Sequence, residues 1–324
     1  MKGNSRWWTV GLLVILVVLP MAPGPAGGGE TRVVTFATTA GGSAGFLTDA
    51  IRQQRLDERH GLLLDLKAFD PAKAEEGVYY RRVDAGIFPF VTAARVNLRG
   101  TALRIFYPLL WNHNSLLVRR EAPFQKLEEL KGKRLAMLAR ITAQYPSVAV
   151  IGRILGMDVE RDFQLIFGTP PSLIAFLQKR EVDAIVQLEP LVSKMVAAGW
   201  ARELLRFNDL WKEQNGGMMF FIGLAAHKEW IDANRDTARR LARTMRDGIA
   251  YVRAQPEETI RRGMTALGFT KDEEVALFRA RLPQIYPDRW GEAAIAQANA
   301  LIRRNVEHGL LERMPPEEIF LRLD

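Results

Sequence analysis

The chain has 324 residues, of which 48% are hydrophobic and 25% charged, so it is long enough for two compact units and has the composition of a folded protein. It contains no cysteine, which excludes disulfides, thiolate metal sites, iron–sulfur clusters and cysteine nucleophiles. The formal charge is +8 at pH 7. Its basic residues are spread as pairs near acidic ones, such as Arg81 and Arg82, which favours a solvated surface over a nucleic-acid interface.

The first residues have the pattern of an export signal. Lys2 and Arg6 precede an apolar run from Trp7 to Pro20, and small residues follow. We predict a signal peptide over residues 1–28 and a periplasmic or secreted mature protein, which carries +6 once the two basic residues are subtracted from +8. The apolar run is shorter than the ~20 residues of a membrane-spanning helix, so an uncleaved anchor is the weaker alternative.

Strand-like apolar runs alternate with amphipathic runs of helical period along the rest of the chain. This alternation predicts α/β units with parallel sheets, because parallel strands need a helical crossover between them. From about residue 231 onward the pattern is almost entirely helical. Strands are expected at 32–38, 62–69, 83–88, 102–110, 115–120, 163–168 and 182–187, inside 218–230, and after a helix and turn within 126–138.

Two segments, RRVDAGIFPF and REVDAIVQLEP, are near copies of each other. In each, an aspartate begins a short apolar run, and a proline ends the run and can start the next helix. Two copies in matching places predict two similar lobes with the carboxyl ends of their strands aimed at one cleft. We expect lobe 1 at 29–113, lobe 2 at 114–217, and a return to lobe 1 with C-terminal helices at 218–324.

An ordered set of segments carries a family resemblance: the glycine-rich turn after Thr38 and Thr39, HGLLLDL, RRVDAG, LEELKGKRLAML, RILGMD, REVDAIVQLEP and AAGW. Together with the signal peptide, they resemble the periplasmic solute-binding proteins of ABC importers in the nitrate, taurine and aliphatic-sulfonate group, which includes binders of thiamine-pyrimidine precursors. The resemblance implies a type II periplasmic-binding-protein fold, with two α/β lobes, two hinge crossings and a helical C-terminal tail. It also implies a monomer without cofactor that captures a small solute and delivers it to an ABC permease in the cytoplasmic membrane.

The topology predicts which residues contact the ligand. The turn after the first strand presents backbone N–H groups at a helix start, and an arginine after a strand of the second lobe is suited to an anion. For each candidate a purely structural role is the alternative. The candidates are Gly42, Ser43, Phe88, Trp111, Asn112, Asn114, Arg140, Thr142, Tyr145, Gln187, Glu189 and Gly217.

Enzyme signatures are absent from the sequence. The four histidines, His60, His113, His227 and His308, lack metal-ligand spacing, and there is no G-x-S-x-G motif or phosphate-binding P-loop. A related enzyme of thiamine-pyrimidine synthesis depends on a cysteine-rich motif that this chain lacks. We therefore expect no catalysis, metal or nucleic-acid partner, with a periplasmic enzyme or ligand sensor on the same fold as the alternative. The ligand is left open among sulfonate, nitrate, pyrimidine, flavin and aromatic acid, as a small organic solute with an anion among the options.

Overall fold

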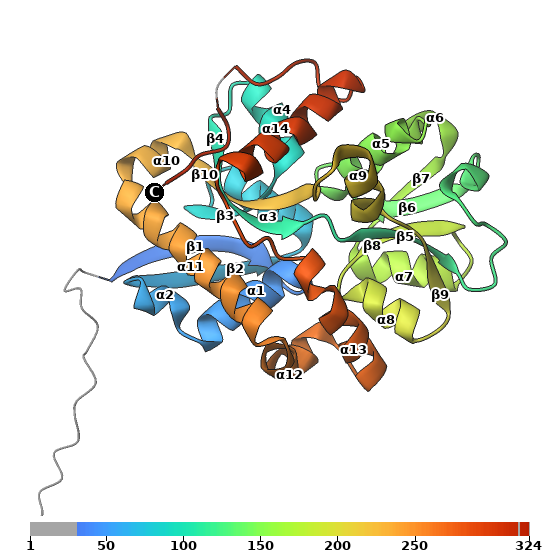
Figure 1. Ribbon diagram of the computed structural model, residues 1–324, viewed down its shortest axis with the longest axis horizontal. Helices are drawn as coiled ribbons and strands as arrows, with labels where there is room; N and C mark the ends of the chain where they lie inside the picture. The colour runs from blue at the N-terminus through green and yellow to red at the C-terminus, as the bar shows by residue number, and fades with distance from the viewer. Residues whose placement is uncertain (1–30, 317, 324) are drawn as a thin grey trace, which may run out of the picture. The chain divides into compact units, whose positions relative to one another are not determined.

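The computed structural model describes residues 31–316 and 318–323 (Figure 1). The predicted signal peptide, 1–28, lies outside these residues. Among the described helices, none combines the length and the apolar composition needed to cross a membrane.

Five strands form the first sheet, in the order β2-β1-β3-β10-β4. Strand β1 pairs in parallel with β2 and β3, whereas β10 runs antiparallel to both β3 and β4. The strands are β1 Arg32–Thr39, β2 Leu62–Phe69, β3 Ala85–Pro89, β4 Leu103–Trp111 and β10 Phe220–His227.

The second sheet also has five strands, in the order β7-β6-β8-β5-β9. Strand β6 pairs in parallel with β7 and β8, and β5 runs antiparallel to β8 and β9. The strands are β5 Asn114–Arg119, β6 Arg134–Leu138, β7 Gln164–Gly168, β8 Ala184–Leu188 and β9 Ala201–Arg206. Strand β9 was not expected from the sequence, because three of its six residues are charged and five are only partly buried.

The two sheets have corresponding strand orders, which confirms the two α/β lobes expected from the repeated segment. The expectation of wholly parallel sheets was wrong, since each sheet contains one antiparallel strand. In both sheets this is the first strand after the chain crosses from the other lobe, β5 in one direction and β10 in the other. A strand that enters from the opposite lobe runs against strands that are connected by helices within the lobe.

The two crossings lie next to each other. One joins β4 to β5 through Asn112 and His113, and the other joins the end of α9 to β10. The Asn112 backbone N–H donates to the carbonyl of Met219 at 2.7 Å, so one crossing is hydrogen-bonded to the other. The chain therefore crosses between the lobes at two places, where the hinge crossings were expected.

Helices cover the sheets of both lobes (Figure 1). Pro89 and Pro190, which were expected to start helices, are the N-cap residues of α4 and α8. Helices α3 and α7 also start on prolines, and α7 has a capping box between Thr169 and Ser172. The first lobe contains α1 Gly42–Gln53, α2 Leu56–Arg59, α3 Pro71–Tyr79 and α4 Phe90–Leu98, and the second contains α5 Gln144–Ile154, α6 Val159–Asp162, α7 Pro170–Gln178, α8 Leu191–Ala197 and α9 Phe207–Asn215. Two short 3-10 helices lie at Leu127–Leu130 and Leu282–Gln284.

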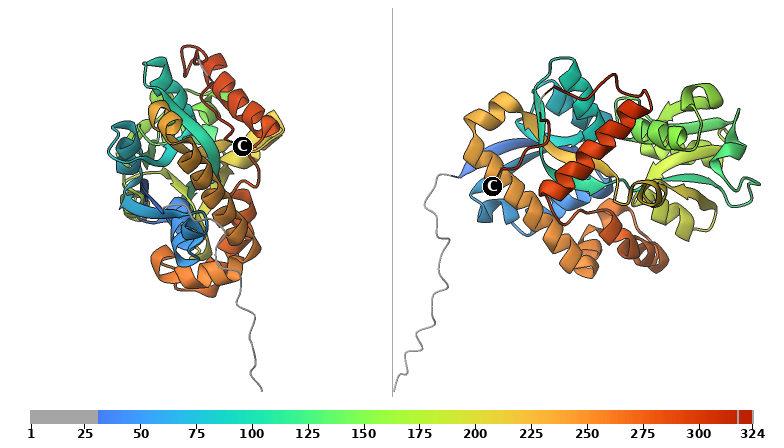
Figure 2. Two further views of the ribbon diagram at one scale, coloured as in Figure 1. Left: turned by 90° about the vertical axis from the view of Figure 1, so that its left-hand side faces the viewer. Right: turned by 45° about the horizontal axis from the view of Figure 1, so that its top comes forward.

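The C-terminal region is helical, as expected, and most of it packs on the first lobe (Figure 2). Helix α11 runs along α1, α2 and β4, and α14 packs on α4 and β10, whereas α13 reaches the second lobe and packs on α8. The helices are α10 Lys228–Ala233, α11 Arg235–Ala254, α12 Pro256–Leu267, α13 Asp272–Arg281 and α14 Glu292–Glu307.

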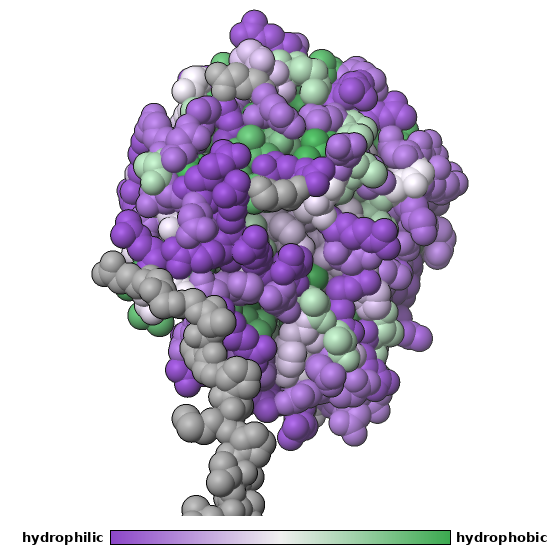
Figure 3. Space-filling model, turned by 60° about the vertical axis from the view of Figure 1, so that its left-hand side comes forward, coloured by the Kyte–Doolittle hydropathy of each residue, from purple (hydrophilic) through white to green (hydrophobic). Residues whose placement is uncertain are grey.

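The surface is largely polar on the face that Figure 3 shows, with hydrophobic residues in small separate areas. Aromatic side chains are concentrated in the core instead. Phe90 stacks on Phe220 with ring centroids 4.8 Å apart, and Trp290 and Phe320 pack around the same pair. This cluster ties β10, the strand that returns from the second lobe, to α4 and the C-terminal segment.

Candidate ligand-binding site

A cavity of about 340 Å³ lies between the two lobes, at the carboxyl ends of their strands. Thr39 and Phe69 end β1 and β2 on one side, and Leu138 and Leu188 end β6 and β8 on the other. Because parallel strands end at the same edge of each sheet, the loops and helix starts of both lobes meet there. The lining is mostly apolar, which suits a small organic molecule.

Three of the predicted contact residues line this cavity: Gly42, Ser43 and Thr142. Gly42 has a φ of +67°, so the turn into α1 uses a backbone conformation that favours glycine. Ser43 is buried, and its hydroxyl donates to the backbone carbonyl of Glu189 at 3.1 Å, which joins the first lobe to the second. The Thr142 hydroxyl donates to the Ala139 carbonyl at 2.8 Å.

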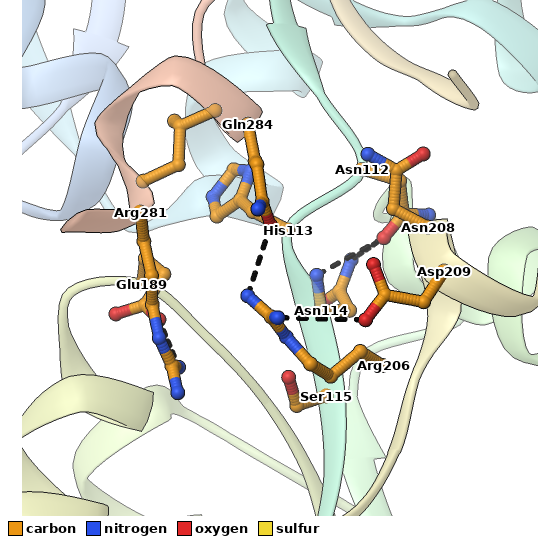
Figure 4. Close-up of a pocket in the computed structure, with 11 residues that line it drawn as sticks. Asn112, His113, Asn114, Ser115, Glu189, Arg206, Asn208, Asp209, Arg281 and Gln284 are labelled. Carbon is orange, nitrogen blue, oxygen red and sulfur yellow. Dashed lines mark hydrogen bonds and ion pairs between the residues drawn. The ribbon is translucent and has the colours of Figure 1, made fainter. Parts of the chain in front are cut away.

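Three other predicted residues, Asn112, Asn114 and Glu189, line a smaller pocket of about 20 Å³ next to the crossings (Figure 4). Both the backbone N–H and the side-chain amide of Asn114 donate to Asn112 Oδ1 at 3.0 Å. Gln144 Nε2 donates to Asn114 Oδ1 at 2.8 Å. The asparagines are therefore engaged in holding the crossing and the start of α5 in place.

Glu189 forms a buried ion pair with a residue that sequence reasoning missed. Its Oε1 lies 2.5 Å from Nη1 of Arg281, and Nη2 of the same arginine lies 2.5 Å from Oε2 of Glu203. Burial raises the pKa of Glu189, and the pairing with Arg281 opposes that shift. Because Arg281 ends α13, this triad attaches the C-terminal region to the second lobe. No sequence pattern relates residues 92 positions apart.

Four predicted residues lie near the crossings or in the core, outside the lining of the large cavity. Phe88 is buried in β3, and Trp111 packs on Phe220 with centroids 4.4 Å apart. Gln187 is buried in β8 and donates to the Pro170 carbonyl at 3.0 Å, behind the cavity wall. Gly217 lies before β10, and a Cβ there would contact the Gln297 side chain.

Arg140 and Tyr145 lie on the surface of the second lobe. The Arg140 guanidinium pairs with Glu160 and lies 5.0 Å from the centroid of the Tyr145 ring and 4.8 Å from that of Phe167. Arg140 holds the pKa of the Glu160 carboxyl below its usual range. Neither residue lines the cavity, and the charge of Arg140 is balanced by Glu160, so their placement lends no support to the predicted ligand contacts.

Glu75 is a cavity residue that sequence reasoning did not select. It lies on α3 with 2% of its surface exposed, beside the backbone of Ala143 in the other lobe. Its Oε2 has no hydrogen-bond partner, and burial raises its pKa well above the ordinary value. The segment AEEG has the composition of an exposed helix face, so nothing in the sequence marked one of its two glutamates as buried.

His113 was weighed only as a metal ligand, and the structure gives it another environment. It lies between the two asparagines of the first crossing, lines both cavities and is buried. Its Nδ1 lies 2.8 Å from the Trp111 carbonyl, and burial lowers its pKa to about 4. In the part of the chain that the structure describes, no group of three or more His, Asp or Glu residues is arranged to hold a metal.

Comparisons with known proteins agree on this architecture. Residues 50–266 match the NMT1-like family. No curated protein sequence is similar enough to this chain to count as a match.

Solved structures with the same arrangement cover nearly the whole chain at low sequence identity. The alkanesulfonate-binding protein SsuA from Xanthomonas axonopodis pv. citri, bound to MOPS, has a TM-score of 0.73 and 16% identity over 91% of this chain and 99% of its own. The periplasmic aliphatic sulphonate-binding protein SsuA from Escherichia coli has a TM-score of 0.66 and 17% identity over 89% and 95%. The Candida albicans CA3427 gene product, described as having the generic periplasmic binding protein fold, has a TM-score of 0.65 and 11% identity over 91% and 98%. These similarities confirm the predicted periplasmic-binding-protein fold.

Proposed function

The chain belongs to the NMT1-like family, and we propose that it is the substrate-binding component of an ABC importer. In this proposal a small organic solute enters the cleft between the lobes, the lobes close around it, and the complex docks on a permease of the cytoplasmic membrane. The protein acts as an exported monomer, without turnover of the solute.

One observation carries the proposal: an interlobe cavity of about 340 Å³ lined by both lobes. A hydrogen bond crosses from one lobe to the other beside it, from Ser43 to the Glu189 carbonyl, and Glu75 of the first lobe lies beside the Ala143 backbone of the second. A ligand that replaces solvent in such a cavity contacts both lobes at once and so favours the closed arrangement over an open one.

The two crossings support the predicted lobe boundaries. The first passes from lobe 1, 29–113, to lobe 2, 114–217, and the second returns to 218–324. We infer hinge motion at these two places because a rotation of one lobe needs backbone changes only at the crossings, whereas each sheet remains intact.

A thermal-shift screen of the purified protein tests the proposal. A solute that binds only the folded state stabilises it by about 2.7 kcal/mol at a hundredfold excess over its dissociation constant. The library contains sulfonates, nitrate, pyrimidines, flavins, aromatic acids and amines, and each hit is followed by calorimetry and small-angle X-ray scattering. We expect stoichiometric binding with a smaller radius of gyration. A hit that is chemically converted by the protein points to the enzyme alternative.

A further inference from the structure

The described lining of the large cavity contains acidic but not basic side chains. Asp70 and Glu75 line the cavity, and its described lining contains no lysine or arginine. Arg140, the predicted partner of an anion, is paired with Glu160 on the surface. The charges of the wall therefore do not match an anionic ligand.

The hydroxyl donors of the wall are already used inside the protein. An O–H group donates one hydrogen bond, so a ligand that needs donors finds none available on these side chains. The donations are from Thr39 to the Gly41 carbonyl, from Ser43 to the Glu189 carbonyl and from Thr142 to the Ala139 carbonyl.

Two of the helices that start at the cavity also have fewer donors in their first turn. Helix α3 begins with Pro71, and α7 begins with Pro170 and Pro171, all of which line the cavity. Proline has no backbone N–H, so each of these prolines removes one of the donors that a helix start offers to an anion.

Acceptors, by contrast, remain available. Glu75 is buried and its Oε2 has no partner. The Trp111 carbonyl can only accept, so the proton between it and His113 lies on Nδ1 of the imidazole and leaves the lone pair on Nε2. A buried acceptor without a donor destabilises the protein, and a ligand that supplies the donor removes this cost.

Resting on the proposed solute-binding function, we propose that the cavity binds an organic cation of the amine or amidine class, whose N–H groups donate to the Glu75 carboxylate. The apolar lining contacts the organic body, and His113 Nε2 is a second acceptor on the same wall. An amidinium suits Glu75 because its N–H groups form charge-assisted hydrogen bonds with carboxylate oxygens.

Because Glu75 is buried, binding of a cationic ligand is coupled to the release of a proton from its carboxyl group. In the empty cavity its raised pKa favours the protonated carboxyl. A cationic ligand favours the carboxylate, so binding releases the proton. The affinity for the cation therefore increases with pH, up to the pH at which Glu75 is already ionised in the ligand-free protein. A ligand that accepts a hydrogen bond from protonated Glu75 has the opposite pH dependence.

Isothermal titration calorimetry with two planar probes of similar size, benzamidine and benzenesulfonate, tests this. Wild-type protein is expected to bind benzamidine, more tightly at pH 8 than at pH 6, and not benzenesulfonate. Glu75→Gln keeps the shape but loses the charge, and should weaken benzamidine binding about tenfold or more, since a charge-assisted hydrogen bond is worth about 1.5–3 kcal/mol. Glu76→Gln, the matched change on the neighbouring residue outside the lining, should keep the affinity within about threefold.

The outcomes separate this inference from the proposed function. Binding of benzenesulfonate that is unaffected by Glu75→Gln overturns the cation inference but leaves the carrier function intact. Benzamidine affinity that is equal in the two glutamine variants also overturns it, provided that circular dichroism shows both to be folded. If neither probe nor any member of the wider screen binds, the carrier proposal falls as well.

Discussion

Asp84 in the first lobe and Asp183 in the second hold equivalent positions, each bonded to the backbone of a residue 49 positions earlier. The Asp84 N–H donates to the Thr35 carbonyl at 3.1 Å and its Oδ2 accepts from the Thr35 N–H at 2.8 Å. Asp183 bonds Arg134 in the same way, at 3.0 and 2.9 Å. The aspartates of the repeated segment therefore hold adjacent parallel strands in register, and neither lines the interlobe cavity.

Replacing these aspartates should destabilise the lobes. Asp84→Ala removes a charged acceptor from a backbone N–H and from the Thr35 hydroxyl, and is expected to lower the free energy of unfolding by about 2–3 kcal/mol in urea titration. Asp183→Ala should cost less, because Arg134 has no hydroxyl and its guanidinium makes only a long contact of 3.5 Å with Asp183. The control is Asp65→Ala on β2, an exposed aspartate paired with Lys67, where a change of more than about 1 kcal/mol would argue against this assignment.

The pairing of Arg281 with Glu189 leads to a second prediction. Arg281→Met leaves two glutamates without their shared partner, one of them fully buried, and is expected to lower the free energy of unfolding by about 3–5 kcal/mol. Arg279→Met, two residues earlier, breaks only an exposed pair with Glu257 and should cost about 0–1 kcal/mol. Equal effects of the two substitutions in a denaturant titration would show that the triad adds nothing specific.

The buried His113 should make the free energy of unfolding decrease at acidic pH. Its pKa is lowered from 6.5 to about 4 by burial, so the folded state binds the proton less readily than the unfolded state. The stability contributed by neutral His113 is therefore complete above about pH 6.5 and is lost as pH falls from there to about 4. His113→Gln should flatten the pH dependence of the unfolding free energy over this range, as measured by urea titration at several pH values.

Glu75 should have the opposite pH dependence and lower stability at neutral pH. Because its pKa is raised above 4.5, its contribution is fully present below that value and is lost as pH rises through the folded-state pKa. Glu75→Gln is thus expected to be more stable than wild type at pH 8, with the difference shrinking toward pH 5. Chemical denaturation at several pH values measures this. A glutamine variant less stable than wild type at pH 8 would mean that the carboxylate has a stabilising partner.

Local sequence signals were sufficient for most of the elements and for the two α/β lobes. Strands, helices and their proline starts depend on periodicity and on residues next to each other in the chain, so most were predicted within a few residues. The strand orders confirm what the repeated segment suggested, because two copies of one local pattern fold into two copies of one arrangement. Strand β9 was not predicted, because the sequence of a half-buried strand with charged residues is similar to that of a loop.

The tertiary structure decided which side chains meet at the cavity. Gly42, Ser43 and Thr142 were predicted because the strand–turn–helix topology directs those turns to the cleft. Glu75 was missed because burial depends on how α3 packs against the opposite lobe, and the sequence around it is that of a surface helix. The pairing of Arg281 with Glu189 depends on how α13 packs against α8. These helices are far apart in the chain, and no local sequence pattern encodes their contact.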